Sequence, residues 1–374
     1  MRSPIRSWDG RSFHVVKMKV LFLPSSNRSS NPYQWELADA LGKHGVDVVL
    51  SRGIGKLPIL GAVRTSRKPD VIHLHWTHGF IVASSALKTI AKGLRFLLEL
   101  ALLKLMGIKV VWTVHNLLQH ERQHPRLELL FTRIAVRLYD HLIVHCETAK
   151  EAVIKTYRLS QTFKKKISVI PHGNYLGCYE NSISRSVARE RLGFQDEHIV
   201  FLYIGQIRPY KGVPLLMDTF LNLRDPRARL LIAGKPATDQ LKEEIEERAQ
   251  RDSRIILRLT FIPDNEVQLY LNAADVVVLP YRDILTSGAA ILAMSFGRPV
   301  IAPRLGCMVE TIDEGKGGYL YDPKQEGDLF RAMQEALKAD LAAMGKYNLN
   351  KVRKLDWDEI ARMTLEVYKS VLRR

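Results

Sequence analysis

The sequence predicts an α/β protein in which two domains each carry a doubly wound parallel sheet. Short apolar runs of strand length alternate with segments of helical periodicity along the chain, a pattern typical of parallel sheets. The 374 residues are enough for two domains with separate cores. A polar, serine-containing stretch at 176–198 separates the two series of strands. We therefore expect the domain boundary there.

The segment Phe201–Gly212 is the centre of the second half. Its apolar strand ends at Gly205, and a short loop with Arg208 and Lys211 leads into the next helix. Such a loop lies at the carboxyl edge of a parallel sheet, where open sheets bind ligands. Two cations on a constrained loop suit a diphosphate, whose charge must be neutralised at more than one oxygen. The segment therefore predicts a diphosphate site.

A second strand, loop and helix start follow between Asp275 and Met294. Thr286, Ser287 and Gly288 fall at the predicted beginning of the helix. Free backbone N–H groups and the helix dipole favour an anion at this position. We expect these residues to share the phosphate site.

These segments resemble the motifs of the GT-B glycosyltransferases, in particular the family-4 type and its bacterial polysaccharide-assembly members. The resemblance rests on motifs whose order and spacing cover nearly all of 199–323. They are Gly-Gln-Ile-Arg-Pro-Tyr-Lys-Gly (205–212), Ala-Gly-Lys (233–235), Phe-Ile-Pro-Asp-Asn-Glu-Val (261–267), Ser-Gly…Ala-Met-Ser-Phe-Gly-Arg-Pro-Val-Ile-Ala (287–302), Glu310 and Gly-Gly-Tyr-Leu-Tyr-Asp-Pro (317–323).

The resemblance implies a GT-B fold, with two Rossmann-like domains facing a central cleft. It implies a metal-independent hexosyltransferase without a cofactor, in which Arg208 and Lys211 replace a metal at the departing diphosphate. The sugar would pass from a UDP- or GDP-linked donor to an acceptor hydroxyl, for example on a lipid-linked saccharide in cell-surface polysaccharide synthesis. The implied donor-binding residues are Gly205, Gln206, Ile262, Pro263, Thr286, Ser287, Gly288 and Glu310. Glu310 could orient a sugar hydroxyl or cap a nearby helix.

The chain departs from the family pattern at the usual pair of glutamates. Ile284 and Leu292 stand at those positions, and Gln206 replaces the usual arginine after the loop glycine. The phosphate-binding residues remain, but the contact with the nucleotide ribose loses its carboxylate. A nucleotide-sugar epimerase of the same fold and a non-catalytic partner subunit therefore stay as alternatives.

In the first half, candidate acceptor residues follow the predicted strands. The resemblance places His115 beside the sugar and the phosphates of the donor, in a catalytic role, and Glu121 becomes a candidate general base if the enzyme inverts configuration. His75 could contact an acceptor sugar and Trp76 could stack on one. The remaining candidates for the acceptor side of the cleft are Asn31, Asn116, His172 and Asn174.

The net charge of +17 is concentrated in the first half. Residues 1–175 hold 27 Lys/Arg against 11 Asp/Glu, and the rest hold 29 against 28. No zinc-finger spacing or aromatic RNA-binding motif accompanies these cations, so we do not expect a nucleic-acid partner. Segment 81–106 combines leucines with cations at helical spacing and is interrupted too often by charge to span a bilayer. It predicts binding to an anionic membrane surface; a helix packed on the sheet is the alternative.

The cysteines Cys146, Cys178 and Cys307 lie far apart and include no Cys-x-x-Cys pair. This spacing argues against disulfides and a zinc site and suits a reducing cytoplasm, with the protein peripheral at the inner face of the membrane. The predicted organisation is an extension over 1–17, an acceptor domain over 18–175, a nucleotide-sugar domain over 176–355, and a C-terminal helix over 356–374 that braces the first domain.

Overall fold

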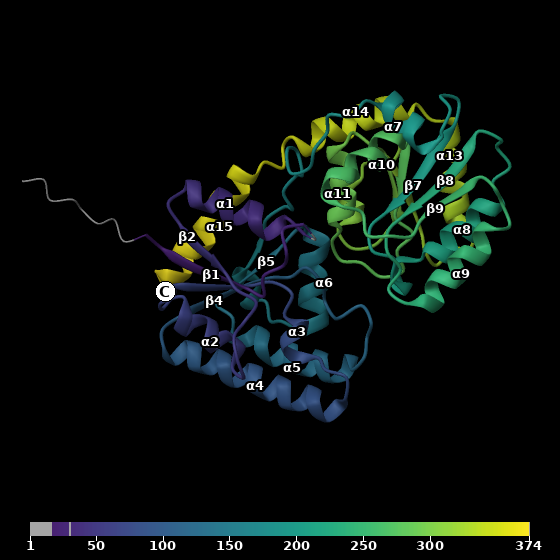
Figure 1. Cartoon of the computed structure of the whole chain (residues 1–374). Helices are drawn as coiled ribbons and strands as arrows, with labels where there is room; N and C mark the ends of the chain where they lie inside the picture. Colours follow the sequence, from purple (N-terminus) through teal and green to yellow (C-terminus); the bar gives the residue numbers. More distant parts are fainter. Residues whose placement is uncertain (1–16, 30, 374) are drawn as a thin grey trace, which may run out of the picture.

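The computed structural model describes residues 17–29 and 31–373, and it has two lobes, each built on a six-stranded parallel sheet (Figure 1). Except for Lys17, the predicted extension over 1–17 lies outside the described residues. The predicted fold class, two Rossmann-like parallel-sheet domains, is confirmed. The exact domain boundaries stay a prediction.

The first lobe has the strand order β2-β1-β3-β4-β5-β6. The strands are β1 (Lys19–Leu23), β2 (Asp47–Leu50), β3 (Val71–Leu74), β4 (Lys109–Thr113), β5 (His141–Val144) and β6 (Ile167–Val169). The helices are α1 (Tyr33–Lys43), α2 (Pro58–Thr65), α3 (His78–Ile81), α4 (Ala86–Leu105), α5 (Pro125–Leu138), α6 (Glu147–Tyr157) and the 3₁₀ turn η1 (Phe163–Lys166).

The second lobe has the order β12-β11-β10-β7-β8-β9, which reverses direction between β7 and β10. The strands are β7 (Ile199–Ile204), β8 (Ala228–Ala233), β9 (Ile255–Arg258), β10 (Val276–Val278), β11 (Val300–Pro303) and β12 (Gly318–Tyr321). The helices are α7 (Arg185–Leu192), α8 (Val213–Leu221), α9 (Asp239–Ala249), α10 (Val267–Ala273), α11 (Gly288–Ser295), α12 (Met308–Thr311), α13 (Asp328–Lys338) and α14 (Leu341–Val352), with 3₁₀ turns η2 (Pro209–Lys211) and η3 (Asp264–Glu266). One more helix, α15 (Trp357–Leu372), ends the chain and belongs with the first lobe.

The inner strands of both sheets are almost wholly buried, because helices cover both faces of each sheet, whereas the edge strands β2, β6 and β9 are partly exposed. This explains why the strands read as continuous apolar runs in the sequence. Ligands bind such sheets at the point where the strand order reverses, so the loops after β7 and β10 are the places to examine.

The last helix, α15, crosses back to the first lobe and packs beside α1 (Figure 1). Its residues Ile360, Val367 and Tyr368 belong to the same apolar cluster as Val20 and Phe22 of β1. The Tyr368 hydroxyl also lies 2.6 Å from Nδ1 of His73 on β3. The first lobe's core is therefore completed by residues from the other end of the chain.

Candidate active site

A cleft of about 890 Å³ lies between the lobes. Both lobes line it, and most of the predicted donor and acceptor residues meet there. From the predictions, the lining includes Asn31, Trp76, His115, Asn116, His172, Gly205, Gln206, Arg208, Lys211, Ile262, Thr286 and Gly288. The two strand–loop–helix units that the sequence singled out thus face the strand ends of the first lobe across one cavity.

Arg208 and Lys211 lie on and beside η2, directly after β7. Burial, together with the neighbouring charge of Arg208, lowers the pKa of Lys211 to about 8. Arg208 forms an ion pair with Glu121 of the first lobe. Two cations close enough to destabilise each other attract an anion strongly, so this corner of the cleft suits a diphosphate.

Close backbone packing shapes the same corner. Gly205 ends β7 and Gly234 ends β8, and a Cβ on Gly234 would lie 1.8 Å from the carbonyl oxygen of Gly205. Only glycine allows these two strand ends to approach so closely. The motif Ala-Gly-Lys therefore places Lys235 in the cleft wall, a cleft residue that we did not single out from the sequence although its motif was recognised.

The start of α11 forms the floor of the cleft beside His115. Ser287 caps this helix, because its Oγ accepts a hydrogen bond from the Ala290 N–H. Thr286 instead donates from Oγ1 to the backbone oxygen of His115, at 3.4 Å. Gly288, the first helical residue, lies open to the cleft. The start of α11 thus lies between the first lobe and the part of the cleft that holds Arg208 and Lys211.

Several predicted site residues do not line the cleft, for identifiable reasons. Ser287 is used as the cap just described, and Glu121 is paired with Arg208 at the rim. Pro263 precedes η3, while its neighbours Ile262 and Asp264 face the cavity. Asn174 donates to the Val352 carbonyl and accepts from the Leu176 N–H, so it anchors the interlobe loop. His75 lies behind His115, and Glu310 contacts the other lobe.

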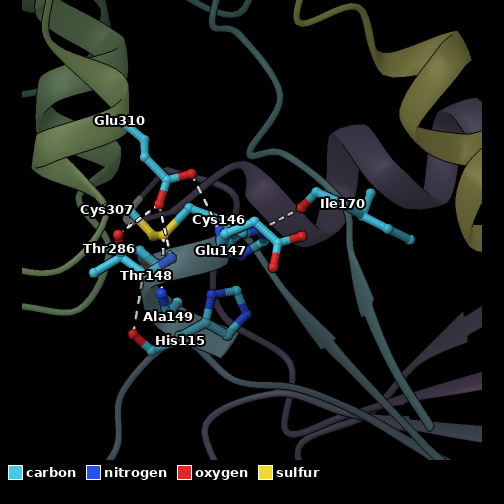
Figure 2. The surroundings of a disulfide bond; sticks show 10 residues. His115, Cys146, Glu147, Thr148, Ala149, Ile170, Thr286, Cys307 and Glu310 are labelled. Carbon is cyan, nitrogen blue, oxygen red and sulfur yellow. Dashed lines mark hydrogen bonds between the residues drawn. A yellow bond between two sulfur atoms is a disulfide. The ribbon is translucent and has the colours of Figure 1, made fainter. Parts of the chain in front are cut away.

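Glu310 caps a helix, but that helix is α6 of the first lobe (Figure 2). Its carboxylate accepts from the N–H groups of Glu147 and Thr148, at 3.1 and 2.7 Å, and from the Thr148 hydroxyl. Partial burial opposes the charged form of the carboxylate, but these three hydrogen bonds at the start of α6 outweigh it and hold the pKa of Glu310 below its ordinary value. Glu310 therefore joins the lobes.

A disulfide between Cys146 and Cys307 lies beside this contact (Figure 2). The expectation of unpaired cysteines is therefore wrong for two of the three; Cys178 is free. The cysteines are separated by 161 residues and belong to different lobes, so their spacing in the sequence could not reveal the pair. Leu285 and Cys307 of the second lobe are also buried within the apolar core of the first.

The chemistry available in the cleft is hydrogen bonding and charge neutralisation. Within residues 17–29 and 31–373, no group of three or more His, Cys, Asp or Glu side chains is arranged to hold a metal ion. The positions where the family resemblance leads us to expect glutamates hold apolar side chains: Leu292 lines the cleft, and Ile284 packs against the core of the second lobe.

Two family models match the chain, one on each lobe. Residues 52–174 match the model described as Glycosyltransferase Family 4, and residues 198–339 match Glycosyl transferases group 1. Together they include most of the residues that line the cleft, among them Trp76, His115, Arg208 and Lys211. The chain is a GT-B glycosyltransferase of this family. The sequence-based recognition of the family is confirmed.

Relatives of this glycosyltransferase support the same assignment. The chain is 29% identical to a GDP-mannose:glycolipid 4-beta-D-mannosyltransferase of Xanthomonas campestris pv. campestris, over 97% of this chain and 95% of the relative. Its fold matches sucrose-phosphate synthase from Thermosynechococcus elongatus, with a TM-score of 0.75 and 20% identity over 95% of this chain and 99% of the other. It also matches Anabaena HepE in complex with UDP-glucose, with a TM-score of 0.71 and 19% identity over 94% and 100%. The protein is thus a nucleotide-sugar glycosyltransferase.

Proposed function

We propose that this glycosyltransferase moves a mannosyl residue from GDP-mannose to a hydroxyl group of a membrane glycolipid. The observation that carries the proposal is the similarity to the Xanthomonas mannosyltransferase over nearly the whole of both chains. It favours GDP over UDP as the nucleotide of the donor, and it supports a lipid-linked saccharide as the acceptor. The cleft between the lobes supplies a place where both substrates can meet.

In this proposal the second lobe holds the nucleotide sugar. Arg208 and Lys211 neutralise charge on the departing diphosphate, and the start of α11 offers its free N–H groups to the same anion. The first lobe presents the acceptor, with Trp76 and His115 in the facing wall. Glu121 leaves Arg208 when the diphosphate arrives, because the phosphate oxygens offer the guanidinium a stronger partner.

The first experiment compares the binding of nucleotides, and the second measures the transfer of mannose. Thermal-shift measurements should show stabilisation by GDP above that by UDP or ADP, and GDP-mannose should label a glycolipid fraction in the presence of the protein. Arg208→Ala should lower transfer by about 100-fold, the typical loss when one charge-stabilising group is removed. The exposed Arg224→Ala is the matched control.

A preference for UDP would overturn the proposed donor. Binding of GDP without transfer or hydrolysis of GDP-mannose would favour the non-catalytic partner, which remains an alternative because the usual glutamates are absent. Conversion of the free nucleotide sugar without an acceptor would favour the epimerase.

We propose further that α4 holds the enzyme on the inner, cytoplasmic face of an anionic membrane; this proposal rests on the charge and the apolar face of the helix, because the disulfide removes the argument from unpaired cysteines. Leu87, Leu94, Leu98 and Leu105 are spaced by seven, four and seven residues and so form one stripe along the helix. Their exposed fractions are 80, 58, 54 and 84%. Leu130 and Ile134 of the neighbouring α5 are exposed too. Such a face suits burial in the headgroup region of a bilayer, and none of the described helices is long and apolar enough to cross one.

The cations of α4 divide into two groups. Lys88 and Lys104 are exposed on either side of the stripe. Lys92 instead donates to the carbonyls of Gly79 and Val82, and Arg95 donates to that of Phe80, so both hold α3 in place. Buried Glu99 accepts from the N–H groups at the start of α2. The cations free to meet lipid headgroups are therefore those flanking the leucines, together with others in the basic first lobe.

Flotation with vesicles tests this surface. The protein should float with vesicles containing phosphatidylglycerol and remain at the bottom with pure phosphatidylcholine. The double substitution Leu94→Glu, Leu98→Glu should abolish flotation, whereas Leu215→Glu at an exposed position of α8 should leave it unchanged. Flotation of the α4 variant equal to that of the native protein would contradict the proposed surface.

A further inference from the structure

Five histidines converge behind the first-lobe wall of the cleft. They come from four different parts of the chain, and each ring contacts at least one other ring of the group. They are His73 on β3, His75 after β3, His115 after β4, His145 after β5 and His172 in the interlobe loop. In this histidine cluster His172 is half-buried and the other four are buried, and only some of the ring nitrogens have hydrogen-bond partners.

His75 and His115 form a direct hydrogen bond within the cluster. Nδ1 of His75 lies 3.1 Å from Nε2 of His115, so one of the two nitrogens must carry the shared proton. Trp76 stacks on His115, with ring centres 4.5 Å apart and planes at 17°. These contacts fix the ring of His115 in one orientation.

The second nitrogen of His115, Nδ1, is the one left for a ligand in the cleft, because Nε2 is engaged with His75 and the residue itself lines the cavity. Nδ1 has no hydrogen-bond partner among the described residues. A neutral imidazole carries a proton on only one of its two nitrogens. The hydrogen bond between Nε2 of His115 and His75 therefore decides whether Nδ1 of His115 is protonated.

The burial of His75 favours one of the two arrangements. Its exposed fraction is 1%, and its Nε2 has no partner among the described residues. If His115 donated to His75, a neutral His75 would carry its proton on Nε2 and bury an unpaired N–H group. If His75 donates, only an unused lone pair is buried there. Buried unpaired N–H groups are the rarer and costlier outcome in folded proteins.

Both rings are neutral in this arrangement. A buried imidazolium without a carboxylate partner is strongly disfavoured, and the ring neighbours of His115 are other histidines and aromatic residues. Accordingly, burial lowers the pKa of both His75 and His115 well below the ordinary value.

We propose that His75 is a positioning residue that fixes His115 in the tautomer protonated on Nδ1, so that His115 offers a hydrogen-bond donor to the cleft. Its partner is an acceptor oxygen of the nucleotide sugar, on the diphosphate or on the sugar ring. A neutral imidazole can polarise such an oxygen through its N–H group. In this state Nδ1 cannot accept the proton of an acceptor hydroxyl, so His115 is not the general base. The identity of the partner rests on the proposed function; the tautomer does not.

Nitrogen-15 NMR of the histidine-labelled full chain tests the tautomer directly. Signals of His115 are assigned by their loss in His115→Gln. We expect Nδ1 of His115 to show the shift of a protonated nitrogen and Nε2 that of an unprotonated one. The reverse pattern would overturn the proposal, whatever the enzyme's activity. Failure of the native protein to bind GDP or GDP-mannose would count against the proposed function alone.

Variants of His75 test its part in this arrangement. His75→Phe removes the donor, so the His115 signals should move toward the average of both tautomers. His75→Gln, whose amide can still donate to Nε2, should restore the native pattern. His145→Phe is the matched control, because His145 is equally buried in the cluster but donates to the Ile170 carbonyl instead. A native His115 pattern in His75→Phe would refute the role of His75.

Binding measurements identify the oxygen. In His75→Phe, affinity for GDP-mannose should fall by up to about tenfold, the value of one hydrogen bond. An equal fall for GDP would place the partner on the diphosphate, and unchanged affinity for GDP would place it on the sugar. Native affinity for both ligands would exclude the donor role of His115. His75→Gln supplies the same comparison if the Phe variant does not fold.

Discussion

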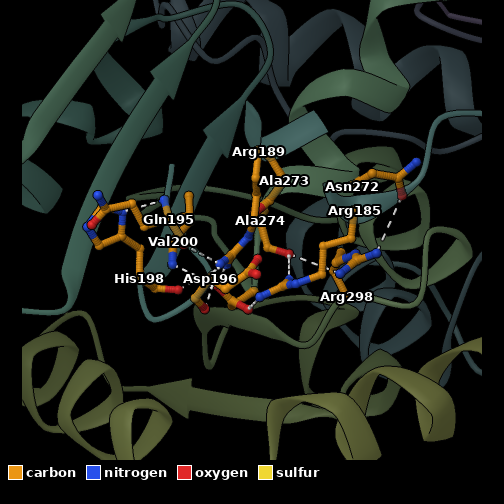
Figure 3. Close-up of polar contacts among 11 residues, drawn as sticks. Arg185, Arg189, Gln195, Asp196, His198, Val200, Asn272, Ala273, Ala274 and Arg298 are labelled. Atoms are coloured by element: carbon orange, nitrogen blue, oxygen red, sulfur yellow. Dashed lines mark hydrogen bonds and ion pairs between the residues drawn. The ribbon is translucent and has the colours of Figure 1, made fainter. Parts of the chain in front are cut away.

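The side chain of Arg189 is buried in the second lobe, with an exposed fraction of 1% (Figure 3). Its guanidinium pairs with Asp275 at 2.6 Å and donates to several backbone carbonyls at the base of the sheet. Those carbonyls belong to Gln195, Asp196, His198 and Ala273. Asp275 in turn accepts from the Val200 N–H, so the network ties α7 to the start of β7. A planar fork of donors suits this role, and lysine does not provide one.

Arg189→Leu should destabilise the protein by about 3 kcal/mol or more, because it leaves the Asp275 carboxylate and several carbonyls without their buried partner. Urea unfolding of the variant and the native protein measures the difference. Arg191→Leu, on the exposed side of the same helix, should change stability little. A loss below about 1 kcal/mol for Arg189→Leu would show that water or neighbouring side chains replace its bonds.

At the same scale, the sequence predicts where a single residue lies better than it predicts which distant residue it contacts. Arg208 and Lys211 could be assigned to the cleft because a strand, a glycine and a short loop define their position. The contact of Glu310 with α6 and the bond between Cys146 and Cys307 could not, because each joins segments far apart in the chain. Those pairs exist only through the arrangement of the lobes.

At the scale of elements, strand ends are the predictable positions. The periodicity of the sequence predicts the buried strands, and the polar residue after each strand then falls at the sheet edge. His115 lies at such a position, and the family resemblance supplied its role. The clustering of histidines from separate strand ends needed the strand order.

The histidine cluster predicts acid lability. Burial lowers the pKa of His73 and His172 to about 3 and that of His145 to about 4, from an ordinary value of 6.5. Below pH 6.5 the unfolded chain therefore binds protons that the folded protein excludes. Stability should be fully present above pH 6.5 and should fall as the pH drops toward 4, each such histidine adding about 1.4 kcal/mol per pH unit to the slope.

Urea unfolding midpoints between pH 8 and pH 4 measure this slope. His145→Phe should reduce it by the contribution of one histidine, whereas replacement of the partly exposed His124 by Phe should not. A slope unchanged in His145→Phe would contradict the assignment of acid lability to the cluster.

At the scale of the whole molecule, the two lobes are joined at one side of the cleft by covalent, apolar and charged contacts together. The disulfide, Leu285 in the first-lobe core and the Glu310 cap lie at neighbouring positions. Opening of the cleft must therefore pivot near this junction, or break it. Two ion pairs, Arg208 with Glu121 and Arg122 with Asp283, also join the lobes, and Asp283 lies only two residues from Leu285 of this junction.

Reduction of the disulfide should lower stability by about 2–4 kcal/mol, because a cross-link closing a long loop restricts the unfolded chain. Urea unfolding with and without dithiothreitol measures the effect. The double substitution Cys146→Ser, Cys307→Ser should unfold at the lower midpoint under both conditions, since serine retains the cap of α6. Cys178→Ser is the control and should respond to the reductant as the native protein does. Equal midpoints for native and reduced protein would show that the other contacts suffice.

The return of α15 to the first lobe has a consequence for biosynthesis. Ribosomes deliver the amino-terminal half first, but the pocket that receives Tyr368 and Val371 stays open until those residues emerge. The second lobe can therefore fold before α15 has completed the core of the first. The two lobes need not finish folding in the order in which they are translated.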